Sequence, residues 1–161
     1  MFVHDASTLA PSYEPGRSMR FVGIKRAYSF AGRDAIPRQW RDFAFHIGAV
    51  PGQIGETVYG IALDAGREDG FDYLTAVEVA ADARPPGTFD CFAAEPARCA
   101  VFHHAGNVAW LADTLDRIHR DWAPLFAGQG LEGVWLIERY GARFDHKTGE
   151  GGVDILLPLK F

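Results

Sequence analysis

The sequence has few cysteines and no long apolar run. Its 161 residues include two cysteines, Cys91 and Cys99, which are too few for a disulfide framework or a zinc site. No stretch approaches the roughly 18 consecutive apolar residues that a membrane-crossing helix requires. Residues 1–13 also lack the apolar segment of a signal peptide. We therefore expect a cytoplasmic protein with reduced cysteines and without membrane association.

An excess of basic charge is missing as well. The chain has 16 Lys and Arg residues against 21 Asp and Glu residues, which gives a formal net charge of −5. Direct nucleic-acid binding is not expected, because it requires a basic face that replaces the counterions of the phosphates. The charge balance slightly favours cationic over anionic ligands.

Motifs for covalent catalysis, phosphate binding and metal binding are not found. No G-x-S-x-G segment marks a nucleophile, and the glycine-containing segments lack the residue order of phosphate-binding loops. The six histidines show no ligand spacing, and the adjacent His103 and His104 would point to opposite faces of a strand. The sequence thus predicts neither a metal site nor a cofactor.

Hydrophobic residues make up 48% of the chain, as in a globular protein, and their periodicity predicts regular elements. In the first half we expect strands at 20–30, 57–64 and 71–79. A helix between the first two strands is predicted to begin near Asp34 and Pro37. One face of that helix carries an apolar stripe, namely Ile36, Trp40, Phe43 and Ile47.

The second half repeats this plan. An extended region at 89–104 is predicted to break at Glu95–Pro96, and strands are expected at 133–140 and 153–160. Between the extended region and the strand at 133–140, Asn107 is predicted to cap a helix that Pro124 ends. The apolar stripe of this helix is Val108, Leu111, Leu115, Ile118 and Trp122.

The order strand–helix–strand–strand therefore occurs twice, with a Pro/Gly linker at 83–87 near the midpoint. We interpret the chain as a loose leader, residues 1–18, followed by one domain, residues 19–161, made of half-repeats at about 19–82 and 88–161. The predicted fold class is α+β. Duplicated β-α-β-β units with pseudo-two-fold symmetry would form an antiparallel sheet with one main helix per half. A ligand cleft is expected between the halves.

Glu138 in the segment VWLIERY is the strongest single candidate for a functional residue. Strand alternation would put the acid on one face with the following residues: Val134, Leu136 and Tyr140. Trp135, Ile137 and Arg139 would take the other face. Because both faces are largely apolar, a carboxylate there is costly unless it is paired or functional. A salt bridge with Arg143 and an acid at the floor of an aromatic pocket are both open interpretations.

Aromatic residues make up 13% of the chain, and several lie where they could surround this acid. A box of aromatic rings around a carboxylate would suit planar or lipophilic cations through stacking and cation–π attraction. For each ring, ordinary core packing is the alternative.

Several short motifs follow one another in a specific order, among them FDY-x(4)-EV, AVF-x-H-x-G before a helix, and DILLPLK at the end. With these motifs, residues 19–161 resemble the GyrI-like small-molecule-binding domain, also called the AraC-type effector-binding domain. The resemblance implies a duplicated β-α-β-β fold that binds lipophilic or aromatic compounds between its halves. Cationic compounds are one option. In bacterial transcription regulators this domain follows a DNA-binding module, whereas this chain resembles a stand-alone, multidrug-binding type of member.

The resemblance places the pocket acid of the family on Glu138. The other candidate ligand contacts are aromatic, namely Tyr59, Tyr73, Trp110, Trp135 and Phe144. In the last strand, Asp154 stands where many members have glutamate. We expect a binding protein rather than an enzyme, acting in sensing or sequestration.

Two alternatives stay open. One is a hydrolase of reactive small molecules, in which Glu138 is the catalytic acid or base. The other is an inhibitory protein interaction, as in gyrase inhibitors of this family. A protein partner and a homodimer are both compatible with the sequence.

Overall fold

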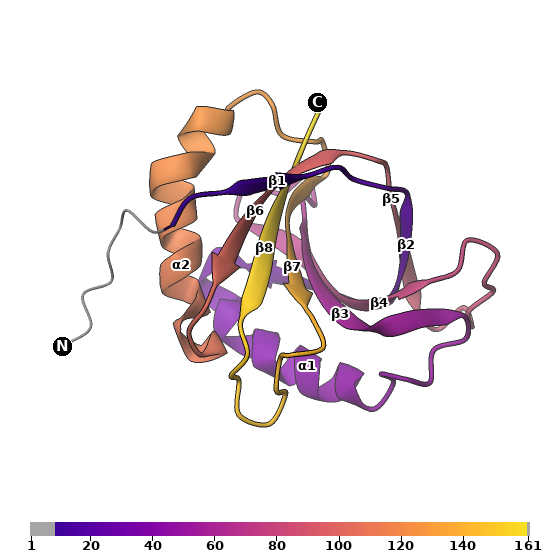
Figure 1. Cartoon of the computed structure of the whole chain (residues 1–161). Coiled ribbons are helices and arrows are strands. Elements are labelled where there is room, and N and C mark those ends of the chain that lie inside the picture. The colour runs from indigo at the N-terminus through magenta and orange to yellow at the C-terminus, as the bar shows by residue number, and fades with distance from the viewer. Residues whose placement is uncertain (1–8, 161) are drawn as a thin grey trace.

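Eight antiparallel strands form one strongly curved sheet in the computed structural model, which describes residues 9–160 (Figure 1). The strands are β1 (Ser12–Glu14), β2 (Met19–Ser29), β3 (Gln53–Leu63), β4 (Gly70–Val79), β5 (Asp90–Ala94), β6 (Arg98–His104), β7 (Val134–Tyr140) and β8 (Val153–Leu159). Their order across the sheet is β1-β6-β8-β7-β3-β4-β2-β5. Each predicted strand is therefore present, and β1 is an addition.

The strand order shows the internal duplication. Each strand of one half has an equivalent in the other: β1 corresponds to β5, β6 to β2, β8 to β4, and β7 to β3. Replacing every strand by its equivalent gives the same strand order read from the opposite edge of the sheet. At the centre, β3 pairs with β7, and Ile61 lies opposite Ile137. The predicted α+β fold with duplicated β-α-β-β units and pseudo-two-fold symmetry is confirmed. Each half also lends a short strand to the other, because β1 pairs with β6 and β5 pairs with β2.

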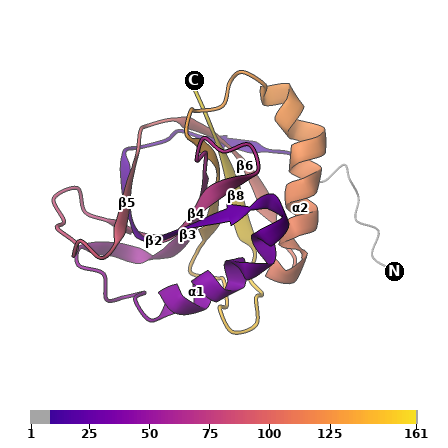
Figure 2. The same ribbon diagram turned by 180° about the vertical axis from the view of Figure 1, so that it is seen from behind.

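Two helices, α1 (Ile36–Ala44) and α2 (Leu111–Arg117), lie on the convex side of the sheet, outside its curve in both views (Figures 1 and 2). The side chain of Asn107 accepts a hydrogen bond from the Ala109 N–H at 2.9 Å, which confirms the predicted cap. The prediction that Pro124 ends this helix is wrong. After α2, a π-helical turn (Ile118–Trp122) leads into a 3₁₀ turn (Ala123–Phe126), where Pro124 takes a first-turn position that requires no N–H. No helix within residues 9–160 is long and apolar enough to span a membrane.

A buried glutamine fixes α1 to the sheet. The Gln39 side chain is 0% exposed. Its amide nitrogen donates to the carbonyls of Ile24 at 2.7 Å and Tyr73 at 2.9 Å, and its oxygen accepts from the Tyr28 hydroxyl at 2.6 Å. Because a buried amide is costly without such partners, this set of bonds sets the position of α1 over β2 and β4. The apolar stripe of the helix did not predict these hydrogen bonds of Gln39.

Strand alternation divides the core into two layers. The layer under the helices includes Val22, Phe43, Phe102, Ile118 and Ile155. The layer on the concave side of the sheet includes Phe21, Tyr59, Ile61, Leu74 and Ile137.

The segment before β2 crosses the concave side of the sheet (Figure 1). Strand β1 pairs with β6 at its edge, and residues 15–18, which we call the strap, lead from β1 to β2. A Cβ on Gly16 would lie 1.9 Å from the carbonyl oxygen of Ala97, so only glycine allows the strap to approach this closely. Residues 12–18 of the predicted leader thus form an edge strand and the strap, and its residues 1–8 lie outside the described part of the chain. A three-residue strand has too short a pattern to be predicted from periodicity.

Candidate functional site

Glu138 lies on β7 at the junction of the two halves, facing the helices. The residue is 7% exposed, and two tyrosine hydroxyls donate hydrogen bonds to its carboxylate. Tyr73 of β4 donates at 2.7 Å, and Tyr140 of β7 donates at 2.6 Å. The cluster of Glu138, Tyr73 and Tyr140 is therefore built from both halves of the chain.

Gly60 makes room for this cluster. It pairs with Glu138 across β3 and β7, and a Cβ on it would lie 2.0 Å from the Tyr73 hydroxyl and 2.9 Å from a Glu138 oxygen. A side chain at this position would displace the phenol. The sequence contained a signal for this residue, because a glycine inside a strand often marks a close approach.

The charge state of Glu138 follows from its surroundings. Burial raises the pKa of its carboxyl above the ordinary glutamate value, while the hydrogen bonds from Tyr140 and Tyr73 act in the opposite direction. Burial and the nearby carboxylate raise the pKa of both phenols well above the usual tyrosine value. No basic side chain of residues 9–160 forms an ion pair with Glu138, so the alternative salt bridge with Arg143 is not formed.

Aromatic rings cover the tyrosines of this cluster. The Trp40 indole of α1 donates to the Tyr73 hydroxyl at 3.2 Å, and its ring centroid lies 5.1 Å from that of Tyr140. Phe144, in the loop after β7, packs edge-to-face on Tyr140 at 4.9 Å. Of the predicted contacts, Tyr73 and Phe144 therefore lie around Glu138. Trp40, which the sequence placed simply in the core, joins them.

The other predicted aromatic residues lie elsewhere. Tyr59 is next to Gly60 in β3 and faces the opposite side of the sheet. Trp110, at the start of the α2 region, is 63% exposed. Trp135 stacks on the ring of Phe30 at a centroid distance of 5.9 Å and lies beside Phe71.

The predicted alternation of β7 is wrong at its start. The register of β3 and β7 shifts between Ala62 and Leu63, opposite residues 134–136. As a result Val134 shares the concave face with Ile137 and Arg139, whereas Trp135 reaches Phe71 on the helix side. A register irregularity depends on how two strands pair, and neither strand reveals it alone.

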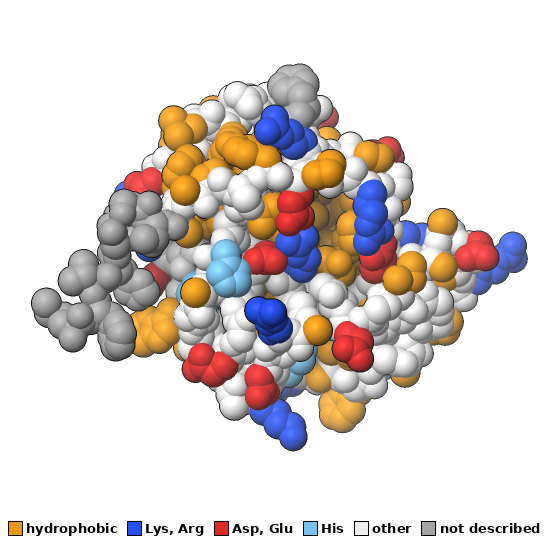
Figure 3. All heavy atoms as spheres, viewed as in Figure 1, with side chains coloured by type: hydrophobic (Ala, Val, Ile, Leu, Met, Phe, Trp, Pro, Cys, Tyr) orange, Lys and Arg blue, Asp and Glu red, His pale blue; other side chains and the backbone are white. Residues whose placement is uncertain are grey.

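A cavity of about 360 Å³ lies on the concave side, between the sheet and the strap. Figure 3 shows it as a hollow with apolar side chains inside and charged groups on both sides. Its lining combines residues of the strap with aromatic and aliphatic residues of the sheet, among them Arg17, Phe21, Tyr59, Ile137, Arg139 and Leu156. This second site was not predicted from the sequence.

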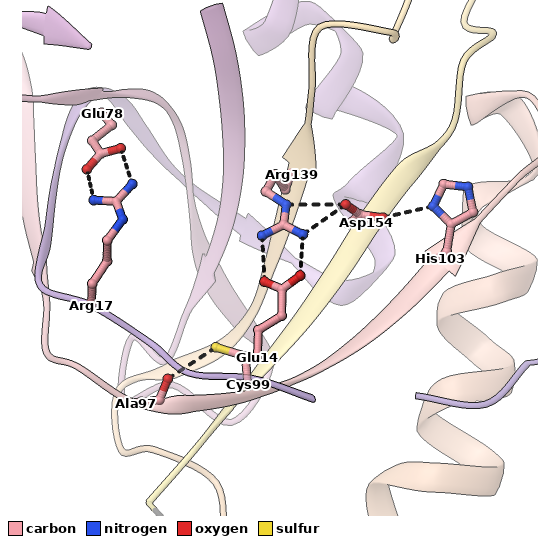
Figure 4. Close-up of polar contacts among 8 residues, drawn as sticks. All are labelled: Glu14, Arg17, Glu78, Ala97, Cys99, His103, Arg139 and Asp154. Carbon is pink, nitrogen blue, oxygen red and sulfur yellow. Dashed lines mark hydrogen bonds and ion pairs between the residues drawn. The ribbon is translucent and has the colours of Figure 1, made fainter. Parts of the chain in front are cut away.

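Two ion-pair groups flank the cavity (Figure 4). On one side, the two terminal guanidinium nitrogens of Arg17 donate to the carboxylate of Glu78, one of them at 2.8 Å. On the other side, Arg139 donates to both oxygens of Glu14, at 3.0 and 3.1 Å. Burial raises the pKa of the Tyr59 hydroxyl between them, and the Glu78 charge adds to that effect.

Asp154 of β8 belongs to the second of these groups. It accepts from Arg139 at 3.0 Å and contacts the His103 ring at 2.8 Å. Burial opposes ionisation of this carboxyl, yet the contacts with His103 and Arg139 lower its pKa overall. Asp154 thus orients Arg139 on the concave face, and within residues 9–160 it forms no hydrogen bond with the Glu138 cluster.

The part of the chain that the structure describes brings together no group of three or more His, Cys, Asp or Glu side chains that could hold a metal ion. His104 instead contacts the hydroxyl of Thr114 at 2.6 Å and the carbonyl of Asn107 at 2.8 Å. His104 thus has a structural role at the start of the second helix.

Solved structures share this fold at low sequence identity. A protein from Staphylococcus aureus MU50 is 17% identical with a TM-score of 0.73, and the match covers 95% of this chain and 99% of that chain. SAV2435, in a structure bound to tetraphenylphosphonium, is 15% identical with a TM-score of 0.73 over 93% of each chain. EcmrR, in a cryo-EM structure with DNA, is 13% identical with a TM-score of 0.62, over 92% of this chain and 56% of that chain. No curated protein sequence matches the chain.

A family model described as the GyrI-like small molecule binding domain matches residues 14–160. This range begins in β1 and ends just after β8, so it spans the sheet and both helices. The match confirms the resemblance found in the sequence motifs. The chain therefore belongs to the family of GyrI-like small-molecule-binding domains.

Proposed function

We propose that this protein binds lipophilic cations and that the carboxylate of Glu138 supplies the counter-charge. One observation carries the proposal. Glu138 is a buried acid that lies among aromatic rings, and within residues 9–160 its hydrogen-bond donors are two neutral phenols rather than a cation. The biological role would be sensing or sequestration of such compounds.

The energetics of a buried charge support this function. An ionised carboxylate loses hydration when it is buried, and two phenolic hydrogen bonds replace only part of that hydration. A cation with an apolar body would compensate the charge and fill the apolar surroundings in one step. The faces of Trp40, Tyr73 and Tyr140 would add cation–π attraction.

A relative of the same fold supports the ligand class. SAV2435 is described as bound to tetraphenylphosphonium, a cation whose charge is surrounded by four phenyl rings. The likeness at 15% identity is one of fold, so the ligand class comes to this chain as part of the proposal.

Ligand access requires movement of the groups that cover Glu138. Trp40 belongs to α1, a helix of nine residues, and Phe144 belongs to the loop at 141–152. Neither is part of the sheet that positions the carboxylate. We expect a displacement of α1 or of this loop to open the site while β7 stays in place.

Isothermal titration calorimetry with tetraphenylphosphonium tests the proposal. We expect Glu138→Gln to weaken binding at one site by a factor of about ten or more, since it removes a charge from a desolvated site. The exposed Glu68→Gln removes the same formal charge elsewhere and should leave affinity unchanged. Triphenylphosphine oxide, which has three of the same rings but no charge, should bind the wild type and Glu138→Gln alike.

A second readout concerns protons. Because the pKa of Glu138 is raised and a cation would bind its ionised form, binding at a pH where the free carboxyl is partly protonated should release protons. The binding enthalpy would then depend on the ionisation enthalpy of the buffer in the wild type and not in Glu138→Gln. Equal affinity of the two proteins together with buffer-independent enthalpy would refute the role of Glu138. Chemical conversion of a bound reactive compound would favour the hydrolase alternative instead.

A further inference from the structure

The cavity on the concave side has the composition of a ligand site. Its floor contains an edge-to-face pair, Phe21 and Tyr59, with ring centroids 4.9 Å apart, next to the aliphatic side chains of Ile137 and Leu156. Its volume of about 360 Å³ lies within the range of small-molecule pockets. The whole β-sheet separates it from the Glu138 cluster, because neighbouring residues of a strand face opposite sides.

The charges around this cavity divide into two sets. The sheet contributes Arg139 to the lining, and it contributes Glu78 and Asp154 just beyond the lining, where they pair with Arg17 and Arg139. Strand β1 and the strap contribute Glu14 and Arg17, and the loop between β5 and β6 adds Glu95. Within the sheet, Arg139 and Asp154 neutralise each other at 3.0 Å. Glu78 is then left with one negative charge that no other group of the sheet compensates by an ion pair within residues 9–160. The sheet side of the cavity therefore carries one uncompensated negative charge, which a single cation would neutralise.

Arg17 of the strap supplies the cation that pairs with Glu78. Its side chain is 64% exposed, whereas that of Glu78 is 8% exposed. The carboxylate is thus a fixed, buried part of the sheet, and the guanidinium reaches it from outside. An exposed partner gains little net free energy from such a pair, because it gives up hydration and side-chain freedom. A cationic ligand that displaces Arg17 from Glu78 therefore has to replace only the small free energy of this ion pair.

We propose that the cavity between the sheet and the strap is a second ligand site, which takes monocations with an aromatic or aliphatic body, and that Arg17 occupies the position of the ligand's charge until the ligand displaces it. The charge of the ligand lies at Glu78, and its apolar body lies on Phe21 and Tyr59. The side chain of Arg17 moves into solvent, and the strap stays attached through the bonds between Glu14 and Arg139.

This proposal extends the ligand class of the proposed function to a second site, and the two sites can be tested separately. The probe is methyltriphenylphosphonium, a monocation with three phenyl rings, titrated by calorimetry. The measurements use the full chain with Glu138→Gln, which removes the charge of the first site. One equivalent is expected to bind in this background.

Variants of the ion pair give opposite expectations. Arg17→Ala removes the internal competitor and should tighten binding by a factor of about three to five, the size expected for an ion pair with an exposed partner. Glu78→Gln should weaken binding by a factor of about ten or more. Arg120 is an exposed arginine that pairs with Asp121 after α2. Arg120→Ala removes the same formal charge and should leave the affinity unchanged. Triphenylphosphine oxide should bind Arg17→Ala no more tightly than its parent.

The outcomes separate the two proposals. If Arg17→Ala leaves the affinity for methyltriphenylphosphonium unchanged, or if it tightens the neutral probe equally, the second site is refuted. This readout does not depend on Glu78→Gln, so it holds even if that variant fails to fold. If wild-type binding depends on Glu78 and Arg17 but not on Glu138, the concave site stands and the proposed role of Glu138 fails. The reverse pattern supports Glu138 and overturns the second site.

Discussion

The hydroxyl of Tyr140 donates a hydrogen bond of 2.6 Å to the carboxylate of Glu138, two residues earlier on the same strand. Residues at this spacing share one face of a strand, so the sequence IERY by itself brings acid and phenol together. The second donor, Tyr73, comes from the other half of the chain. Local sequence and the duplicated fold thus each contribute one hydrogen bond to the buried acid.

The first prediction concerns the pH dependence of stability. The folded pKa of Glu138 is raised above its unfolded value, so the folded state holds this proton more tightly. Its contribution to stability is fully present below the unfolded pKa and is lost as pH rises through the folded pKa. Wild-type protein should therefore lose stability relative to Glu138→Gln as the pH rises above the ordinary glutamate value of 4.5. Urea unfolding of both proteins across this range measures the difference, and a constant difference would contradict the assignment.

Removing one of the two donors should destabilise the protein. Tyr140→Phe leaves the carboxylate with the single bond from Tyr73, and we expect a loss of about 2 kcal/mol in the free energy of unfolding at pH 7. The loss should become smaller as the pH is lowered and the acid becomes protonated, because the neutral carboxyl needs less stabilisation. Tyr13→Phe is the matched control, because its ring is exposed and its hydroxyl makes no hydrogen bond within residues 9–160. Equal stability of the two variants would show that the bond contributes nothing.

Adding one methyl group at Gly60 should disturb the same cluster. Its Cβ would overlap the Tyr73 hydroxyl at 2.0 Å, so Gly60→Ala should cost about 1–3 kcal/mol and displace the phenol from Glu138. Gly87→Ala adds the same group where no atom lies within 4 Å, and it should be nearly neutral. Thermal unfolding of the two variants gives the comparison. A neutral Gly60→Ala would mean that the space around Glu138 is not tightly filled.

The strap should depend on Arg139. This guanidinium joins Glu14 to Asp154, and its side chain is only 26% exposed. Arg139→Leu should speed amide hydrogen exchange in residues 12–17. It should lower the free energy of unfolding by only about 1 kcal/mol, because solvent screens an ion pair whose partner is exposed. The exposed Arg120→Ala should change neither quantity. Unaltered exchange in Arg139→Leu would show that backbone pairing of β1 is sufficient to hold the segment.

Much of the secondary structure could be predicted, because it follows from local patterns. The alternation in β4 and the three- and four-residue spacing after Asn107 identified elements whose type the structure confirms. The order of these elements predicted the duplication. Glu138 stood out for the same local reason, as a carboxylate within an apolar strand.

The polar contacts between elements could not be predicted in this way. Gln39 is a polar residue outside the predicted apolar stripe of its helix, yet it is fully buried between α1 and the sheet. Arg17 lies in a segment without periodicity, and its partner Glu78 is 61 residues away. Such contacts depend on which elements become neighbours in space.

The sequence by itself determined the family, the repeated β-α-β-β units and the buried acid at position 138, because short-range periodicity and ordered motifs carry that information. Only the tertiary structure decided which side chains share a site. It placed Tyr73 and Trp40 beside Glu138, moved Tyr59 to the opposite face, and drew the strap across the concave side of the sheet. The physical reason is that strand register and the docking of distant segments assign each side chain to a face, and both arise from pairing between parts of the chain that are far apart in sequence.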